Sequence, residues 1–263
     1  MEAVSQTARW TAAARALESE REDALFTDEH ARKLAGDTGF ELLKRYAGAG
    51  TAPFIAIRTR YMDDAIMRAA STVRQVVFVA AGMDTRVLRL PWPDDLVIYE
   101  LDRPALLDAK AELLRGARSK PVPVDLAEEW TGALCDAGFR KDLPTLWVAE
   151  GLLFFLTEEC VRALLRDLAA LSAPGSVLVS DMTSAASLKN PFARSFLRAL
   201  SEDGAPWRFG TDDPEGLLLS CGWQVEDLRE PGQEGANFGR WDYPVVPREV
   251  PDVPRSFLFT ARV

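Results

Sequence analysis

Carboxylates stand at the ends of several apolar runs in this sequence. Asp102 follows LVIYEL, about 20 residues after a glycine turn, where an acid can accept both hydrogen bonds from a ribose diol. Asp125 follows PVPV and precedes Leu126, so an exocyclic amine could meet the acid while the apolar neighbour covers a ring. Glu150 interrupts the apolar run 145–156. Because carboxylates are rarely buried without a partner, we expect Glu150 to end a strand at a ligand cleft.

The glycine turn lies within VVFVAAGMDTRVLRL. The apolar run Val76 to Ala81 meets Gly82 and then the turn-forming pair Asp84 and Thr85, a pattern typical of a buried strand, a tight turn and a helix. Gly82 has no Cβ, so a ligand can lie against its backbone, and either polar residue can cap the helix that follows. We therefore expect this turn at the mouth of a nucleotide-type pocket.

The glycine count limits which nucleotide can bind. A dinucleotide fingerprint needs several glycines so that a pyrophosphate can approach bare backbone, whereas Gly82 is preceded here by Ala80 and Ala81. No Gly-Lys-Ser/Thr motif lies between Ala80 and Arg89, which disfavours a phosphate loop. An adenosine ligand without phosphates remains, and S-adenosylmethionine (SAM) meets that description.

Other elements place these residues in a sheet with helices. Asp102 ends the predicted second strand just before Pro104, so capping of the next helix is its alternative, structural role. Thr157 is the expected N-cap of an amphipathic helix that carries two acids in its first turn. A fifth strand, SVLVSDM, places Asp181 at its tip, and GWQVEDLR and SFLFTARV supply the last strands.

These motifs together carry a family resemblance. AAGMDTRVLRL, YELDRP, PVDL and AEGLLFFL, in this order and spacing, resemble the leucine carboxyl methyltransferase-like group of class I SAM-dependent methyltransferases, which includes bacterial polyketide O-methyltransferases. The similarity extends to RALESEREDALFTDEHARKLAG and IRTRYMDD upstream and to the terminal strands downstream.

The resemblance implies an α/β, Rossmann-like fold: a mostly parallel seven-stranded sheet with helices on both faces and an antiparallel last strand. It implies one SAM-dependent methyltransferase domain over residues 1–263. We expect its parts to be a helical extension and lid (1–70), a SAM-binding core (71–182), a substrate-covering helical insert (183–220) and the C-terminal strands (221–263).

The resemblance also implies roles for two arginines. Arg58 matches the arginine that holds the methionine carboxylate of SAM, a bidentate task suited to a guanidinium; its alternative is a surface ion pair with Asp63 or Asp64. Arg15 lies where a second basic contact is often placed. The predicted cofactor-binding residues are Arg15, Arg58, Ala80, Ala81, Gly82, Asp84, Asp102, Asp125, Leu126 and Glu150. Phe155 is the predicted acceptor-pocket residue, and it replaces a tyrosine common in this motif.

Composition restricts the partners. Forty acids and 31 bases give a net charge of −9, which repels nucleic-acid backbones and anionic membranes unless a basic patch intervenes. The chain shows neither a membrane-length apolar run nor a signal peptide, so we expect a cytoplasmic protein. Three widely spaced cysteines without a CxxC pair indicate neither a disulfide framework nor a zinc site, and no metal is expected.

The N-terminal segment 5–70 is expected to be helical, with a break at residues 47–53. Its apolar residues are predicted to pack in the core or lid rather than to bind ligand: Trp10, Leu17, Leu25, Phe26 and Leu34. The single histidine, His30, is predicted to be a solvated helix residue, although histidine is the commonest general base.

The leading functional hypothesis is O-methylation of a small molecule, a polyketide-like specialised metabolite. The alternatives are methylation of a partner protein's C-terminal carboxylate, which Phe155 in place of tyrosine disfavours, and a non-methylating SAM-binding scaffold or cyclase. A carboxylate acceptor is favoured over a hydroxyl because a carboxylate needs no base at neutral pH. The sequence leaves the acceptor's identity and the oligomeric state open.

Overall fold

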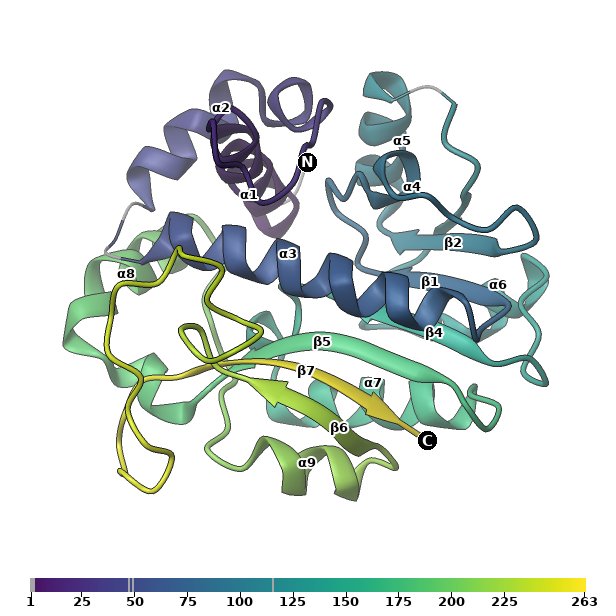
Figure 1. The fold of residues 1–263 in the computed structure, drawn as a ribbon. Helices are drawn as coiled ribbons and strands as arrows, with labels where there is room; N and C mark the ends of the chain where they lie inside the picture. The colour runs from purple at the N-terminus through teal and green to yellow at the C-terminus, as the bar shows by residue number, and fades with distance from the viewer. Residues whose placement is uncertain (1–2, 47, 49, 115) are drawn as a thin grey trace.

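The computed structural model describes residues 3–46, 48, 50–114 and 116–263. Its centre is a seven-stranded sheet with the order β3-β2-β1-β4-β5-β7-β6 (Figure 1). Neighbouring strands from β3 to β5 pair in parallel, whereas β7 pairs antiparallel with both β5 and β6. The predicted sheet and its antiparallel last strand are confirmed. The strands are β1 (Gln75–Val79), β2 (Val97–Asp102), β3 (Lys120–Pro123), β4 (Thr145–Ala149), β5 (Val177–Thr183), β6 (Gln224–Arg229) and β7 (Ser256–Arg262).

Helices cover both faces of the sheet. In Figure 1, α3 crosses in front of the strands, and α7 lies behind them. The helices are α1 (Ala3–Ser19), α2 (Ala31–Arg45), α3 (Thr51–Ala70), α4 (Arg86–Arg89), α5 (Pro104–Leu113), α6 (Thr131–Asp136), α7 (Glu158–Ala170), α8 (Arg194–Glu202) and α9 (Pro214–Ser220). Short 3₁₀ turns are η1 (Leu153–Phe155), η2 (Ala185–Lys189) and η3 (Pro191–Ala193).

The central strands are apolar on both sides because each side packs against helices. Successive strand residues point to opposite faces. Val76 and Phe78 pack in the cluster that contains the α3 residues, whereas Val77 and Val79 pack in the cluster that contains the α7 residues. The continuous apolar run that begins at Val76 is therefore the pattern of a strand buried on both faces.

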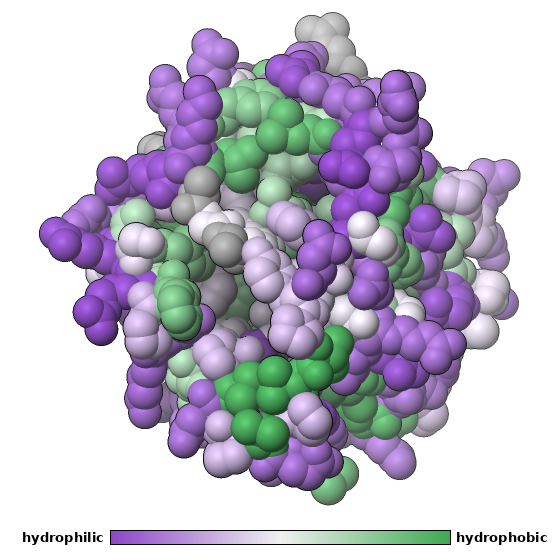
Figure 2. Space-filling view, turned by 60° about the vertical axis from the view of Figure 1, so that its left-hand side comes forward, coloured by the Kyte–Doolittle hydropathy of each residue, from purple (hydrophilic) through white to green (hydrophobic). Residues whose placement is uncertain are grey.

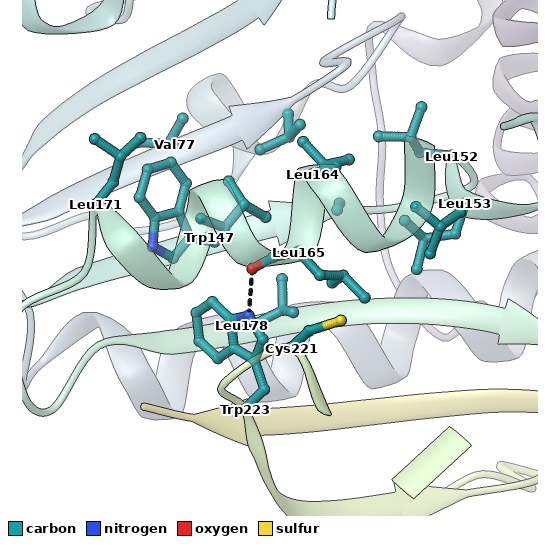
Figure 3. Packing of buried hydrophobic residues seen from close by; sticks show 14 of the residues in the cluster. Val77, Trp147, Leu152, Leu153, Leu164, Leu165, Leu171, Leu178, Cys221 and Trp223 are labelled. Carbon is teal, nitrogen blue, oxygen red and sulfur yellow. Dashed lines mark hydrogen bonds between the residues drawn. The ribbon is translucent and has the colours of Figure 1, made fainter. Parts of the chain in front are cut away.

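Helix α7 begins and packs as predicted. The Thr157 hydroxyl accepts a hydrogen bond from the Cys160 backbone N–H at 3.3 Å, and the apolar face of the helix lies in the core. Trp223, just before β6, donates from its indole Nε1 to the carbonyl of Leu165 at 2.8 Å (Figure 3). This bond satisfies a buried indole N–H and joins the C-terminal hairpin to the helix layer.

Several boundaries differ from the prediction. β1 ends at Val79 rather than Ala81, because Ala80 adopts a positive φ of 53° that no strand residue has. The fourth apolar run is a strand only up to Ala149, after which the chain turns through η1. β5 continues to Thr183, so Asp181 lies inside the strand and not at its tip. The apolar runs predicted where these strands lie but not the residues at which they end.

The N-terminal region is helical as predicted, with corrections. Residues 47 and 49 of the expected break lie outside the described residues, and α3 already begins at Thr51. Arg58 therefore lies within α3, about two turns from its start. Leu17 is 45% exposed, so its predicted packing role is wrong. His30 is the partly buried N-cap residue of α2 rather than a solvated helix residue.

Replacing Leu168 in α7 tests the helix layer. Leu168 is fully buried in the core, so Leu168→Ala should lower the free energy of unfolding by about 2–5 kcal/mol through lost burial and a cavity. Urea unfolding measures the change. Leu219→Ala is the matched control because Leu219, on α9, is 70% exposed, and it should change stability by less than about 0.5 kcal/mol. Equal losses in both variants would contradict the packing.

Candidate functional site

A cavity of about 900 Å³ opens at the carboxyl ends of the central strands. Its walls come from the turn after β1, the ends of β2, β3 and β4, and parts of α1 and α3. The insert after β5 and the linker between β6 and β7 complete it. Figure 2 shows a hollow near the middle of the face drawn, with groups of hydrophobic side chains above and below it. Open α/β sheets bind ligands at this edge.

The turn after β1 is fixed to the end of β2. Ala80 and Gly82 have positive φ values of 53° and 52°, and the Gly82 backbone N–H donates to Asp102 Oδ2 at 2.7 Å. A Cβ at Gly82 would lie 3.3 Å from the Ala8 Cβ of α1. The bare backbone therefore lets the turn pass between α1 and the cavity.

Asp102 is 9% exposed on the cavity wall. Burial raises the pKa of this carboxyl above its usual value, while hydrogen bonds from the Gly82 and Arg103 backbones oppose the shift. Arg103, not Asp102, is the N-cap residue of α5, so the capping alternative is wrong. Asp102 Oδ1 accepts from Arg103 N at 2.7 Å. Each carboxylate oxygen thus receives one backbone donor and has a lone pair for another.

Asp125 and Leu126 follow β3 and line the same wall. Asp125 accepts from the Ala127 backbone N–H at 3.0 Å, and its other oxygen lies 3.3 Å from Arg103 Nη2. The structure therefore places the end of β3 beside that of β2, with Leu126 as an apolar neighbour of the acid.

Arg58 is buried between two acids from neighbouring strands. Its Nε donates to Glu150 Oε1 at 2.8 Å, and its Nη1 donates to Asp181 Oδ2 at 3.0 Å. Gly151 N–H donates to the other oxygen of Asp181 at 2.6 Å. The alternative role of Arg58, a surface ion pair with Asp63 or Asp64, is therefore wrong. Asp181 instead fixes Arg58 and the turn after β4.

Arg86 is a site residue that the sequence reasoning missed. It donates from Nε to Asp63 Oδ1 at 2.6 Å and from Nη1 to Glu150 Oε2 at 2.5 Å, and it also pairs with Asp84. Its side chain is only 3% exposed. The sequence feature that could have indicated this role is the position of Arg86 directly after the turn, because the predicted buried acids needed a basic partner.

We define the buried ion network as Arg58, Arg86, Asp84, Glu150 and Asp181. Burial alone would raise the pKa of each acid. For Asp84 burial is the largest single effect, but the charges of Arg86, Lys110 and Arg15 together outweigh it and lower the pKa to about 2. Glu150 also has a lowered pKa because Arg86 and Arg58 oppose its burial. Burial prevails at Asp181 and raises its pKa.

Arg15 of α1 supports the turn from the other side. Its Nε donates to Asp28 Oδ2 at 2.9 Å, and its Nη2 donates to the Met83 carbonyl at 2.6 Å. Thr85 donates to the same Asp28 oxygen at 2.7 Å. Arg15 lines the cavity, but these contacts tie it to the protein backbone and to Asp28.

Aromatic side chains form the other half of the cavity. The rings of Phe154 and Trp207 lie 4.4 Å apart, and the Phe196 ring meets Trp207 edge-on at 5.3 Å. Trp10 of α1 and Phe155 of η1 also line this half. Residues of α1, α3 and the insert 183–220 thus line the cavity.

The linker 230–255, between β6 and β7, forms a further wall of the cavity. Its Trp241 and Tyr243 line the cavity. Arg255 is 9% exposed; it donates to Glu230 Oε2 at 2.8 Å and to the Val246 carbonyl at 2.8 Å. This buried arginine folds the linker onto the site.

The model of the family described as leucine carboxyl methyltransferase matches residues 8–169, more than half of the chain. The chain belongs to the leucine carboxyl methyltransferase family. One relative, from Mycolicibacterium gilvum (strain PYR-GCK), is 37% identical over 90% of this chain and 87% of its own length. Another, from Streptomyces avermitilis, is 37% identical over 89% and 87%. Both carry the name of a SAM-dependent methyltransferase.

Solved structures share the fold of this family member. A DUF574 family protein from Streptomyces avermitilis MA-4680 has a TM-score of 0.61 at 15% identity, covering 95% of this chain and 96% of its own. A protein from Thermobifida fusca YX described as a methyltransferase has a TM-score of 0.58 at 17% identity, covering 95% and 93%. The expected family, fold and dependence on SAM are confirmed. Within the described residues no helix has the length and apolar character of a membrane span.

The cavity suits SAM on the evidence of its own residues. The turn presents backbone without a side chain at Gly82, and Asp102 retains acceptor capacity. Gly151 has a positive φ of 67°, and a Cβ there would lie 3.2 Å from Arg58 Nη1. A side chain at either glycine would crowd the turns that border the cavity.

The low pKa of Asp84 predicts a pH-dependent contribution to stability. Because its folded-state pKa of about 2 lies below the usual value, the stabilisation is present above about pH 5 and is lost as the pH falls towards 2. Asp84→Asn should lower the free energy of unfolding by about 2 kcal/mol at neutral pH, with the difference shrinking at low pH. Urea unfolding across pH measures it.

The control for this series is Asp64→Asn, in the exposed pair with Arg60. It should change stability little at any pH, since exposed ion pairs are worth little. A constant Asp84→Asn effect from pH 7 to 2 would contradict the assigned ion pairing.

Proposed function

We propose that this family member is a SAM-dependent O-methyltransferase acting on a carboxylate or acidic hydroxyl of a small molecule. The supporting observation is that one cavity joins two chemically different halves: a polar half at the ends of β1, β2 and β3, and an aromatic half under the insert and linker. Its volume of about 900 Å³ lies near the upper end of the range for ligand pockets. It can therefore take a methyl donor and a small acceptor together.

In this proposal the polar half holds the methyl donor. Asp102 accepts from the ribose diol, and Asp125 with Leu126 holds the adenine. The backbone at Ala80, Ala81 and Gly82 lies against the nucleoside.

The buried ion network directs one guanidinium towards the donor's amino acid. The Nε and Nη1 atoms of Arg58 are held by Glu150 and Asp181, respectively. These contacts fix the orientation of the guanidinium. We assign Arg58 to the methionine carboxylate.

The protein's contribution to the reaction is alignment and exclusion of water. When bound, SAM would supply a methyl group carried on a positively charged sulfur. The acceptor oxygen would form a bond to this methyl group while the carbon–sulfur bond breaks and S-adenosylhomocysteine leaves as a neutral thioether. The aromatic half holds the acceptor in line with that methyl group, and such positioning is worth up to about 7–11 kcal/mol. The apolar wall also keeps water from competing with the acceptor.

A carboxylate acceptor suits the residues of the aromatic half. His30 does not line the cavity, and the acid in this half, Glu230, is paired with Arg255. A carboxylate (pKa about 4) is already ionised at neutral pH, whereas a phenol or alcohol (pKa about 10 or higher) needs a base. Methylation of a carboxylate therefore does not require a general base in the aromatic half.

Donor binding is tested at Asp102. Calorimetry should show one S-adenosylhomocysteine (SAH) per chain, and Asp102→Ala should weaken binding by about 1.5–3 kcal/mol through loss of hydrogen bonds to a charged group. Asp108→Ala on the neighbouring helix α5 is the control, because Asp108 is exposed and does not line the cavity. Wild-type binding of NAD but not of SAH would contradict the assignment.

Methyl transfer is tested with labelled SAM and a panel of small acids and phenols. The rate with an acid should be nearly constant between about pH 6 and 9 and should survive His30→Ala within a few fold. A steep rise near pH 6.5 that disappears in His30→Ala would instead show a histidine base and a hydroxyl acceptor. Tight SAH binding without transfer to any acceptor would favour a non-methylating scaffold.

A further inference from the structure

One of the arginines that line the cavity has no acidic partner among the described residues. The acids Asp84, Asp125, Glu150 and Glu230 each lie against an arginine. The arginines that line the cavity at positions 15, 58, 103 and 255 are likewise engaged. Among the described cavity-lining arginines, only Arg208 has a guanidinium with no ion pair or hydrogen bond to the protein.

The backbone that carries Arg208 is held firmly. Arg208 N–H donates to the Phe154 carbonyl at 2.7 Å, and Thr211 N–H donates to the Thr183 carbonyl at 2.9 Å. Between them, Gly210 packs so closely that a Cβ would lie 2.5 Å from the Ser184 carbonyl oxygen. The segment therefore joins η1 to the end of β5, and the base of the Arg208 side chain has a fixed position.

Arg208 is exposed and follows an aromatic wall of the cavity in the sequence. Its neighbour Trp207 lies against Phe154 with ring planes tilted by 38°, and Phe196 meets Trp207 at 85°. Phe192, at 96% exposure, also lines the cavity. Planar rings can stack on such a wall, and these aromatic contacts add to the burial of apolar area.

We propose that the methyl acceptor is an aromatic carboxylic acid whose carboxylate pairs with Arg208 while its ring lies against the Trp207 wall. This inference rests on the proposed function. An unpaired guanidinium offers a two-donor edge that matches a carboxylate, and Arg208 is exposed at the cavity, so a ligand can reach this edge. In a chain with a net charge of −9, a cation without an acidic partner is also a local attraction for an anionic ligand.

Equilibrium binding to the SAH-saturated protein tests the proposal without requiring turnover. The probes are 2-naphthoate and its neutral match, 2-naphthamide. Wild-type protein should bind 2-naphthoate about two- to fivefold more tightly than 2-naphthamide, the range of an exposed ion pair. Arg208→Gln should weaken 2-naphthoate about two- to fivefold, which removes the preference for the acid, and leave 2-naphthamide nearly unchanged.

Arg194→Gln is the matched control, because Arg194 begins α8 in the same insert, is exposed and does not line the cavity. It should bind both probes like the wild type. Arg208→Lys should recover part of the 2-naphthoate affinity because it keeps the charge without the fork.

Three outcomes would overturn the assignment: equal binding of the two probes to wild type, unchanged 2-naphthoate binding in Arg208→Gln, or no 2-naphthoate binding to wild type. SAH binding is measured separately in every variant. Failure of wild type to bind SAH would contradict the proposed function, whereas normal SAH binding with any of the three outcomes would contradict only the role of Arg208.

Discussion

The pairing of buried arginines with buried carboxylates at the strand ends is the interaction on which the site depends. Arg86 joins Asp84 of the turn after β1 to Glu150 after β4, and Arg58 joins Glu150 to Asp181 of β5. Each buried ion costs several kcal/mol of desolvation, and removal of one partner typically costs 3–5 kcal/mol. These ion pairs therefore fix the ends of the strands relative to one another, and this fixes the geometry of the polar half of the cavity.

Much of the fold followed from local pattern. Unbroken apolar runs such as the one from Val76 predicted strands covered on both faces, and acids at the ends of those runs predicted the edge where Asp102, Asp125 and Glu150 now gather. Pairing was not predictable in the same way. The partners of Arg58 lie 92 and 123 residues away in sequence, and the place of Arg86 after the turn did not indicate that Glu150, 64 residues away, would be its partner.

The aromatic half was harder to predict because backbone groups and long-range contacts build it. The linker 230–255 is rich in proline and glycine and shows no periodicity, yet Arg255 folds it by binding carbonyl oxygens that every residue carries. The insert illustrates the same limit. Its sequence predicted a cover, but the attachment of residue 208 to the Phe154 carbonyl is a tertiary contact that propensity cannot indicate.

The most direct test of the account compares two ligands in Arg58→Lys by calorimetry. SAH carries the amino acid carboxylate assigned to Arg58, whereas 5′-methylthioadenosine lacks it. Lysine keeps a charge between Glu150 and Asp181 but loses the fork, so affinity for SAH should fall at least about tenfold while that for 5′-methylthioadenosine stays near wild type. Equal weakening of both ligands, or unchanged binding of SAH, would contradict the role of the ion network in positioning the methyl donor.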